Sequence, residues 1–135
     1  MIEKFSIELS TKARRELVNI TSFLERKVEE IKGKGIICIY VPHTTAGLMI
    51  NEDEQGLKKD VLNILEKLVP ESGNYFHNEI DDNADAHLLS ILLKNNACIP
   101  FENGRLLLGT WQSVFFVELD GPRSRRVEAL IIYEA

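Results

Sequence analysis

The feature that most restricts the fold is the apolar, β-branched run from Ile36 to Val41, which Pro42 ends. A continuous run of this kind predicts a strand covered on both faces, because successive side chains point to opposite sides of a sheet. Proline withholds a backbone donor and so ends the ladder of hydrogen bonds. His43, Thr44 and Thr45 are therefore expected to begin at a strand end.

Helical spacing and strand-like alternation occupy different parts of the chain. Alternating apolar residues predict a first strand over residues 5–9, and helical spacing follows Ser22, Leu57 and Ala84, with the third helix running to about Lys94. Residues 98–133 contain short β-rich segments separated by turns. Early helices and late strands predict an α+β fold with about three helices, and we expect the last three strands to form an antiparallel meander.

Length and composition indicate a single domain over residues 1–135. The chain has 135 residues, of which 44% are hydrophobic, and its four prolines and eight glycines are scattered rather than clustered. No stretch reaches the roughly 18 apolar residues that a membrane-spanning helix needs, and the N-terminus lacks the apolar core of a signal peptide. We therefore expect a cytoplasmic protein without a membrane partner.

The charge balance argues against nucleic acid as a partner. Acidic residues outnumber basic residues by 21 to 16, which gives a formal net charge of −5, whereas a nucleic-acid binder needs a basic face. The exception is the cluster of Arg123, Arg125 and Arg126. A compact group of guanidinium groups on an acidic protein favours binding of a small anion. The alternative for Arg125 is that it is a solvent-exposed residue of a strand.

The two cysteines lie in short apolar segments. Cys38 belongs to the run that ends at Val41, and Cys98 belongs to residues 97–100. Neither has a neighbouring cysteine or histidine at the spacing of a metal motif. We interpret both as buried thiols rather than as disulfide partners or metal ligands.

All three histidines lie in polar turn contexts. His43 precedes two threonines, His77 follows Asn74-Tyr-Phe, and His87 lies near the first turn of the third predicted helix. Three neutral imidazoles with one open position would form a catalytic type of zinc site, with Asp82 or Asp81 as a partner that orients a ring. Their spacing matches no compact zinc motif, so three hydrogen-bonded histidines at loop ends are the alternative.

Other polar side chains are candidates for binding a phosphate. Thr44, Thr45 and Thr110 offer hydroxyls at turns, and Gln112 follows Thr110 closely. Asn51 and Glu52 end a strand before the second helix, where Glu52 is either a general base or a helix cap. Trp111, the single tryptophan, is expected in the core.

Taken in order, these motifs resemble those of the YjbQ family over essentially the whole chain. The motifs are His43-Thr-Thr-Ala46, Asn51-Glu52, Gly73-Asn-Tyr-Phe-His77, Asp82-Asn-Ala-Asp-Ala-His87, Gly104-Arg105, Gly109-Thr-Trp-Gln112 and Arg125-Arg126. The resemblance implies an α+β fold of two packed sheets, a homotrimer, and a site near a subunit interface. It also implies a secondary thiamine-phosphate synthase activity, which joins a pyrimidine pyrophosphate to a thiazole phosphate. Asn83 departs from the family pattern, which often has a second aspartate there.

The resemblance and the residue chemistry together give three sets of candidate residues. For catalysis they are His43, Glu52 and Asp82; for ligand binding Thr44, Thr45, Asn51, Thr110, Gln112 and Arg125; and for a metal His43, His77 and His87. Zinc is favoured by the imidazole ligands, and Mg²⁺ by a pyrophosphate substrate.

Three functions fit these candidates. The first is a transferase for a small phosphorylated metabolite, with thiamine-phosphate synthesis as a secondary activity. The second is a zinc-dependent hydrolase that uses metal-bound water, which suits imidazole ligands better than a magnesium-dependent reaction does. The third is a non-catalytic metabolite-binding or damage-control module.

Overall fold

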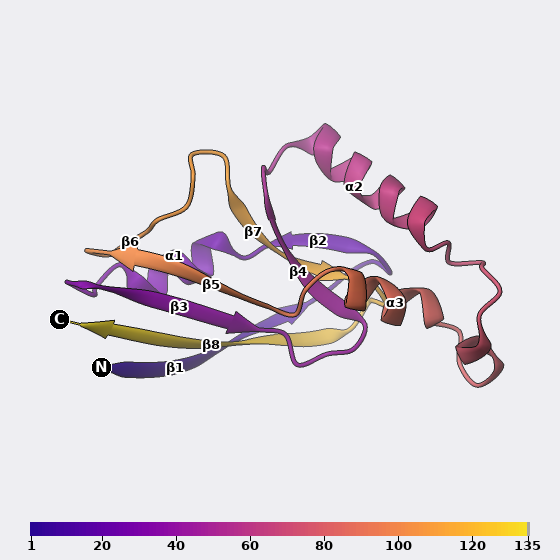
Figure 1. Cartoon of the computed structure of the whole chain (residues 1–135), viewed down its shortest axis with the longest axis horizontal. Helices are drawn as coiled ribbons and strands as arrows, with labels where there is room; N and C mark the ends of the chain where they lie inside the picture. Colours follow the sequence, from indigo (N-terminus) through magenta and orange to yellow (C-terminus); the bar gives the residue numbers. More distant parts are fainter. Residues whose placement is uncertain (135) are drawn as a thin grey trace.

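The structure, a computed structural model, describes residues 1–134 and contains two β-sheets and three α-helices (Figure 1). The predicted α+β fold with two sheets is confirmed. In chain order the elements are β1 (Ile2–Ser10), β2 (Glu16–Asn19), α1 (Thr21–Val28), β3 (Lys34–Tyr40), β4 (Ala46–Asn51), α2 (Gln55–Leu68), the 3-10 helix η1 (Phe76–Glu79), α3 (Ala84–Leu92), β5 (Asn96–Glu102), β6 (Arg105–Leu106), β7 (Ser113–Glu118) and β8 (Ser124–Glu134).

The strands divide into a five-stranded sheet, in the order β1-β8-β3-β5-β6, and a three-stranded sheet, in the order β2-β7-β4. The predicted meander of the last three strands is wrong, because β7 and β8 belong to different sheets. Residues Val114 to Glu118 of β7 are buried on both faces, which suits the centre of the small sheet. By contrast, β8 alternates between buried and exposed residues over most of its length and pairs with the whole of β1.

The two faces of β7 build two apolar clusters. Phe116 faces the space between the sheets, where it joins Ile37 and Ile39 of β3 and Leu24 of α1 in the main core. Val117 faces the opposite way, into a second cluster formed with the apolar sides of α2 and α3. The small sheet is therefore the middle layer of the fold, between the large sheet and the α2–α3 pair.

The outer face of the large sheet has no such cover. Ile37 and Ile39 of β3 are buried, whereas Ile36 is 38% exposed and Tyr40 is 50% exposed. The prediction that this strand is covered on both faces is therefore wrong for the single chain. The same face carries the cysteines, of which Cys98 is exposed, so the interpretation of both as buried thiols is also wrong.

The helices lie close to their predicted positions. Glu54 caps α2, since its carboxylate accepts hydrogen bonds from the amides of Gly56 at 2.6 Å and Leu57 at 2.8 Å. Ser22 is not the cap of α1, which begins one residue earlier, at Thr21. None of the helices within residues 1–134 is long and apolar enough to cross a membrane.

A buried ion pair joins the two sheets. Glu118 of β7 is fully buried and Arg125 of β8 is 8% exposed. The Arg125 guanidinium donates to the Glu118 carboxylate through Nη2 at 2.6 Å and through Nε at 3.0 Å, and the Thr11 hydroxyl donates to it at 2.7 Å. Burial alone would raise the pKa of Glu118, but the hydrogen bonds from Arg125 and Thr11 outweigh it and hold the pKa below its ordinary value of 4.5.

This pair predicts a large, pH-dependent loss of stability in Glu118→Gln. The variant leaves the Arg125 charge buried without a counter-charge, so the free energy of unfolding should fall by about 3 to 5 kcal/mol at pH 7. Because the pKa of Glu118 is lowered in the folded state, its contribution is complete above about pH 4.5 and is lost as the pH falls further. Urea unfolding across this range should show the gap between wild type and variant closing.

Glu25→Gln is the matched control, because Glu25 is exposed on α1. It should change the free energy of unfolding by less than about 0.5 kcal/mol. A Glu118→Gln variant as stable as this control would contradict the assignment.

Candidate functional site

His43 lies in the turn that follows β3, against the backbone of β8. Its Nε2 atom is 3.1 Å from both the amide nitrogen and the carbonyl oxygen of Arg126. Burial lowers the pKa of His43 below its ordinary value of 6.5, and the positive charge of Arg125 lowers it further. The ring is therefore neutral at neutral pH, and Nδ1 is the nitrogen left for a ligand or a proton.

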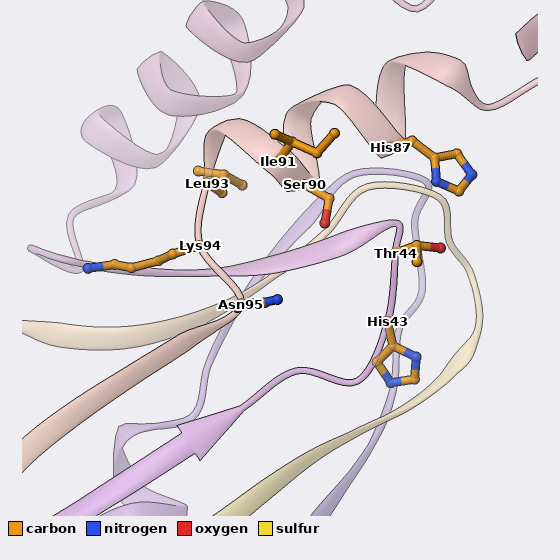
Figure 2. Close-up of a pocket in the computed structure, with 8 residues that line it drawn as sticks. All are labelled: His43, Thr44, His87, Ser90, Ile91, Leu93, Lys94 and Asn95. Atoms are coloured by element: carbon orange, nitrogen blue, oxygen red, sulfur yellow. The ribbon is translucent and has the colours of Figure 1, made fainter.

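His43 opens onto a hollow of about 500 Å³, which we call the central hollow. Its walls come from the turn after β3, from α3 and from the residues before β5 (Figure 2). Figure 2 shows the rings of His43 and His87 and the side chain of Thr44 projecting toward the same side, while the Lys94 ammonium points away from them. The residues that line it are His43, Thr44, His87, Ser90, Ile91, Leu93, Lys94 and Asn95.

The polar groups of the central hollow are two imidazoles, two hydroxyls, an amide and the Lys94 ammonium, which points away from the others. Asn95 Oδ1 already accepts from Asn96 at 2.8 Å, which leaves the Asn95 amide nitrogen as a donor. The Ser90 hydroxyl donates to the Ala46 carbonyl at 2.7 Å and so fixes α3 to β4. No aspartate or glutamate of residues 1–134 lines this hollow. Its chemistry suits an anion better than a cation.

Two further hollows adjoin the central one and share a histidine with it. The arginine hollow, of about 540 Å³, is lined by His43 together with Glu8, Ser10, Ser124, Arg125 and Arg126, among others. The aromatic hollow, of about 490 Å³, is lined by His87 together with Tyr75, Phe76 and His77, among others. His43 therefore lies between the arginine hollow and the central hollow, and His87 lies between the central hollow and the aromatic hollow.

Asn83 fixes the tautomer of His77. The Asn83 amide nitrogen donates to the Asp120 carboxylate at 2.8 Å, so the amide oxygen must face the other way. That oxygen lies 3.2 Å from Nε2 of His77 and can only accept, so Nε2 carries the proton. An aspartate at position 83 could not make both contacts as an ionised carboxylate. Nδ1 of His77 is therefore the free acceptor.

The three imidazoles do not form one metal site. The rings of His77 and His87 lie edge to face with centroids 4.7 Å apart, but His43 belongs to the other end of the central hollow. In the part of the chain that the structure describes, no three histidine, cysteine, aspartate or glutamate side chains are grouped to hold a metal ion. Asp82 orients none of the rings, since it lines a separate acidic hollow with Arg14 and Asp81. A three-imidazole zinc site therefore does not fit this arrangement.

Arg125 and Thr45 support the site from behind. The Arg125 Nη2 atom donates to the Thr45 hydroxyl at 2.8 Å and to the Thr45 carbonyl at 3.2 Å, in addition to pairing with Glu118. Thr45 is itself buried. Both residues hold the turn that presents His43 and Thr44, which is a positioning role; Arg125 also lines the arginine hollow, and ligand binding by these two residues stays a prediction.

The remaining candidates lie at the opposite end of β4. Asn51 pairs with Ser113 of β7, and Glu52 follows it directly. Since β4 has six residues at about 3.4 Å each, this end is roughly 20 Å from Thr45. Gln112 accepts a hydrogen bond from the amide of Gly109 at 2.8 Å and so closes its own turn.

The same loop carries Thr110 and Trp111, both exposed. The expectation that Trp111 belongs to the core is wrong, because its side chain is 72% exposed. Within one chain, then, the candidate residues form two groups at the two ends of β4 rather than one site.

Sequence reasoning missed three residues that shape the site. Ser90 and Asn95 line the central hollow, but neither belongs to a motif. Asp85, in the first turn of α3, is fully buried and pairs with Arg14 at 3.2 Å and Arg15 at 2.7 Å, which anchors the helix that carries His87. The adjacent arginines were the available signal, because two neighbouring guanidinium groups favour a shared carboxylate.

Comparison with known proteins shows the family. The family described as UPF0047 protein YjbQ-like matches residues 5–134. A UPF0047 protein from Archaeoglobus fulgidus is 50% identical over 121 residues, which cover 90% of this chain and 94% of that protein. YugU of Bacillus subtilis is 37% identical over 122 residues, which cover 89% and 92%. The chain therefore belongs to the YjbQ (UPF0047) family.

Solved structures agree with this assignment. A YbjQ-like protein of unknown function from Sulfolobus solfataricus P2 superposes with a TM-score of 0.95 at 42% identity, covering 99% of both chains. A YjbQ/UPF0047 family protein from Clostridium acetobutylicum superposes with a TM-score of 0.88 at 37% identity, covering 95% of this chain and 99% of that one.

Proposed function

We propose that this chain binds a small phosphorylated metabolite across the central and arginine hollows. The observation that carries the proposal is the position of His43, which is neutral, partly buried and shared by both hollows. On one side lie Ser124, which offers a hydroxyl, and Arg126, whose Nε pairs with Glu128 at 2.9 Å and whose two Nη groups remain for a phosphate. On the other lie Thr44 and Asn95, whose polar groups suit the rest of a metabolite.

His43 is also our candidate for moving a proton. A neutral imidazole can accept a proton near neutral pH, and Nδ1 faces away from the Arg126 backbone contact. Glu52 lies at the far end of β4, and Asp82 lines the acidic hollow, so neither carboxylate reaches this ligand within one chain. We therefore assign proton transfer to His43 in place of Glu52 and Asp82.

We propose thiamine-phosphate synthesis as a secondary activity of this site, on the basis of the family resemblance. The thiazole nitrogen forms a bond to the pyrimidine methylene carbon and pyrophosphate leaves, so the reaction mainly needs positioning and neutralisation of the leaving group. Mg²⁺ prefers oxygen ligands, and the central hollow has no carboxylate among residues 1–134 to hold it. The absence of a carboxylate ligand for Mg²⁺ among these residues favours slow turnover, and with it a binding or damage-control role as the primary function.

We also propose the homotrimer that the resemblance implies. Several large apolar side chains on the helical side are exposed in the single chain: Phe76 is 92% exposed, Ile80 85%, Ile91 76% and Leu68 61%. Large apolar side chains that a single chain leaves exposed are candidates for burial against a neighbouring subunit. Assembly of three subunits would also let the end of β4 that carries Asn51 approach the hollows of a neighbouring subunit.

The binding proposal predicts that inorganic pyrophosphate binds at His43 and Arg126. Titration calorimetry should detect binding to the wild type, and His43→Ala and Arg126→Ala should each weaken it at least about tenfold, or about 1.4 kcal/mol, because Arg126→Ala removes a charge-assisted donor and His43→Ala removes the ring that both hollows share. All variants should sediment with the wild-type mass, which we expect to be that of three chains.

Lys59→Ala is the matched control for charge, because Lys59 is exposed on α2 and its loss also removes one positive charge. Its affinity for pyrophosphate should equal that of the wild type. Equal weakening by Lys59→Ala and Arg126→Ala would mean that net charge, rather than this site, controls binding.

A divalent cation is a second proposal, confined to the pair His77 and His87. The observation that favours it is the contact of the two rings, together with the free Nδ1 of His77. Two imidazoles supply part of the coordination that zinc requires, with water or phosphate oxygens in the other positions. A bound cation would neutralise phosphate charge beside the central hollow.

This proposal predicts which histidines matter for metal binding. Elemental analysis of tag-free protein equilibrated with zinc should show bound zinc in the wild type and in His43→Ala, and loss of zinc in His77→Ala and His87→Ala. Loss in all three variants would restore the three-imidazole site, and retention in all three would exclude the histidines as ligands.

A further inference from the structure

The two cysteines, which are distant in the sequence, face each other across the large sheet. Cys38 of β3 pairs in register with Cys98 of β5, and Figure 1 shows the two strands side by side. Both side chains belong to the outer face of the sheet, where Cys98 is exposed and Cys38 is half-buried. Neither cysteine lines the central, arginine or aromatic hollow.

The hydrogen-bond pattern shows which kind of pair this is. At one end of the β3–β5 ladder, the amide of Val41 donates to the carbonyl of Asn95 at 2.7 Å. At the other end, the amide of Asn103 donates to the carbonyl of Gly33 at 2.7 Å. Hydrogen-bonded and non-hydrogen-bonded pairs alternate along an antiparallel ladder. Counting from either end, Cys38 and Cys98 occupy a non-hydrogen-bonded pair.

That position brings the two thiols within bonding reach. Directly opposite residues of a non-hydrogen-bonded pair have Cα atoms about 4.5 Å apart, with their side chains close together. A disulfide accepts Cα separations of about 4.4 to 6.8 Å, so this pair lies inside the range but near its lower limit. A bond formed near that limit is easily reduced, as in redox-active rather than structural disulfides.

We infer that Cys38 and Cys98 form a redox-active dithiol, which a hydroperoxide oxidises to a cross-strand disulfide and a small thiol reduces again. The sulfur of Cys98 takes one oxygen atom from the peroxide to give a sulfenic acid and the first water. The sulfur of Cys38 then displaces that oxygen as a second water and forms the S–S bond. In total, the two thiols lose two hydrogen atoms and hydrogen peroxide becomes two water molecules.

The environments of the two thiols set their order of reaction. Burial raises the pKa of Cys38 to about 11, and its hydrogen bond with Cys98 adds to the shift. Since the thiolate is the reactive form, the exposed Cys98 is the thiol that meets the oxidant and Cys38 is the one that resolves the intermediate. The disulfide would link β3 to β5 covalently. Since β3 leads to His43 and β5 follows Asn95, oxidation would hold these two lining residues of the central hollow in fixed relative positions.

Mass spectrometry of the folded protein after treatment with hydrogen peroxide tests the inference. The wild type should lose the mass of two hydrogen atoms, should lose both alkylatable thiols, and should yield a linked peptide pair containing Cys38 and Cys98. Dithiothreitol should restore both thiols. Cys38→Ser should instead accumulate further oxygen on Cys98, because the resolving thiol is missing.

The double variant Cys98→Ser with Asn96→Cys is the matched control. It keeps two thiols on the same face but places them diagonally, about 7 to 8 Å apart, which exceeds the reach of a disulfide. It should form the linked product at least about tenfold more slowly than the wild type.

Three outcomes would overturn the inference. The first is a wild type that keeps both thiols under conditions in which Cys98 of the Cys38→Ser variant is oxidised. The second is a link between two chains instead of within one. The third is a diagonal control that closes as fast as the wild type.

Discussion

A buried carboxylate must have a partner of opposite charge, and that requirement at Glu118 organises this molecule. Glu118 ends β7 in the small sheet, while Arg125 is the second residue of β8 in the large sheet. The same guanidinium holds Thr45, and the same carboxylate holds Thr11, so four segments meet at one ion pair. The packing of the two sheets therefore depends on an electrostatic contact as well as on apolar burial.

The contact between Glu118 and Arg125 also determines the geometry and the charge at the central hollow. Arg125 fixes the turn that carries His43 and Thr44, and its charge helps to keep the His43 ring neutral. On the opposite wall, α3 is anchored by the buried Asp85 and presents His87. The pair of Arg125 and Glu118 thus supports the wall with His43, and the buried Asp85 with its arginines supports the wall with His87. Among the described residues, no carboxylate lines the central hollow. Such a surface suits a phosphorylated ligand in spite of the acidic net charge of the chain.

The sequence was sufficient for local structure and for the family. The periodicities placed three helices, and Glu52 was placed beside the start of α2, although the residue that caps this helix is Glu54. It was insufficient for long-range pairing, because β7 and β8 join different sheets by burial rather than by proximity in the chain. The site was predicted in part for the same reason. His43 and His87 share a hollow, but Glu52 and Gln112 lie at the other end of β4, and sequence spacing contains no information on which strand end a motif reaches. Arg125 was predicted to bind a ligand because the sequence around Glu118 contains no motif that would reveal it as the buried partner of Arg125.

Nuclear magnetic resonance of the ¹⁵N-labelled imidazoles, recorded across pH with and without pyrophosphate, tests the central claim most directly. We predict that the His43 ring stays neutral below its ordinary pKa of 6.5, and that pyrophosphate shifts the resonances of His43 and His87 together, because both rings line the central hollow. A His43 ring that takes up its proton at pH 6.5 or above in the absence of pyrophosphate, or histidine resonances that pyrophosphate leaves unchanged, would contradict the account.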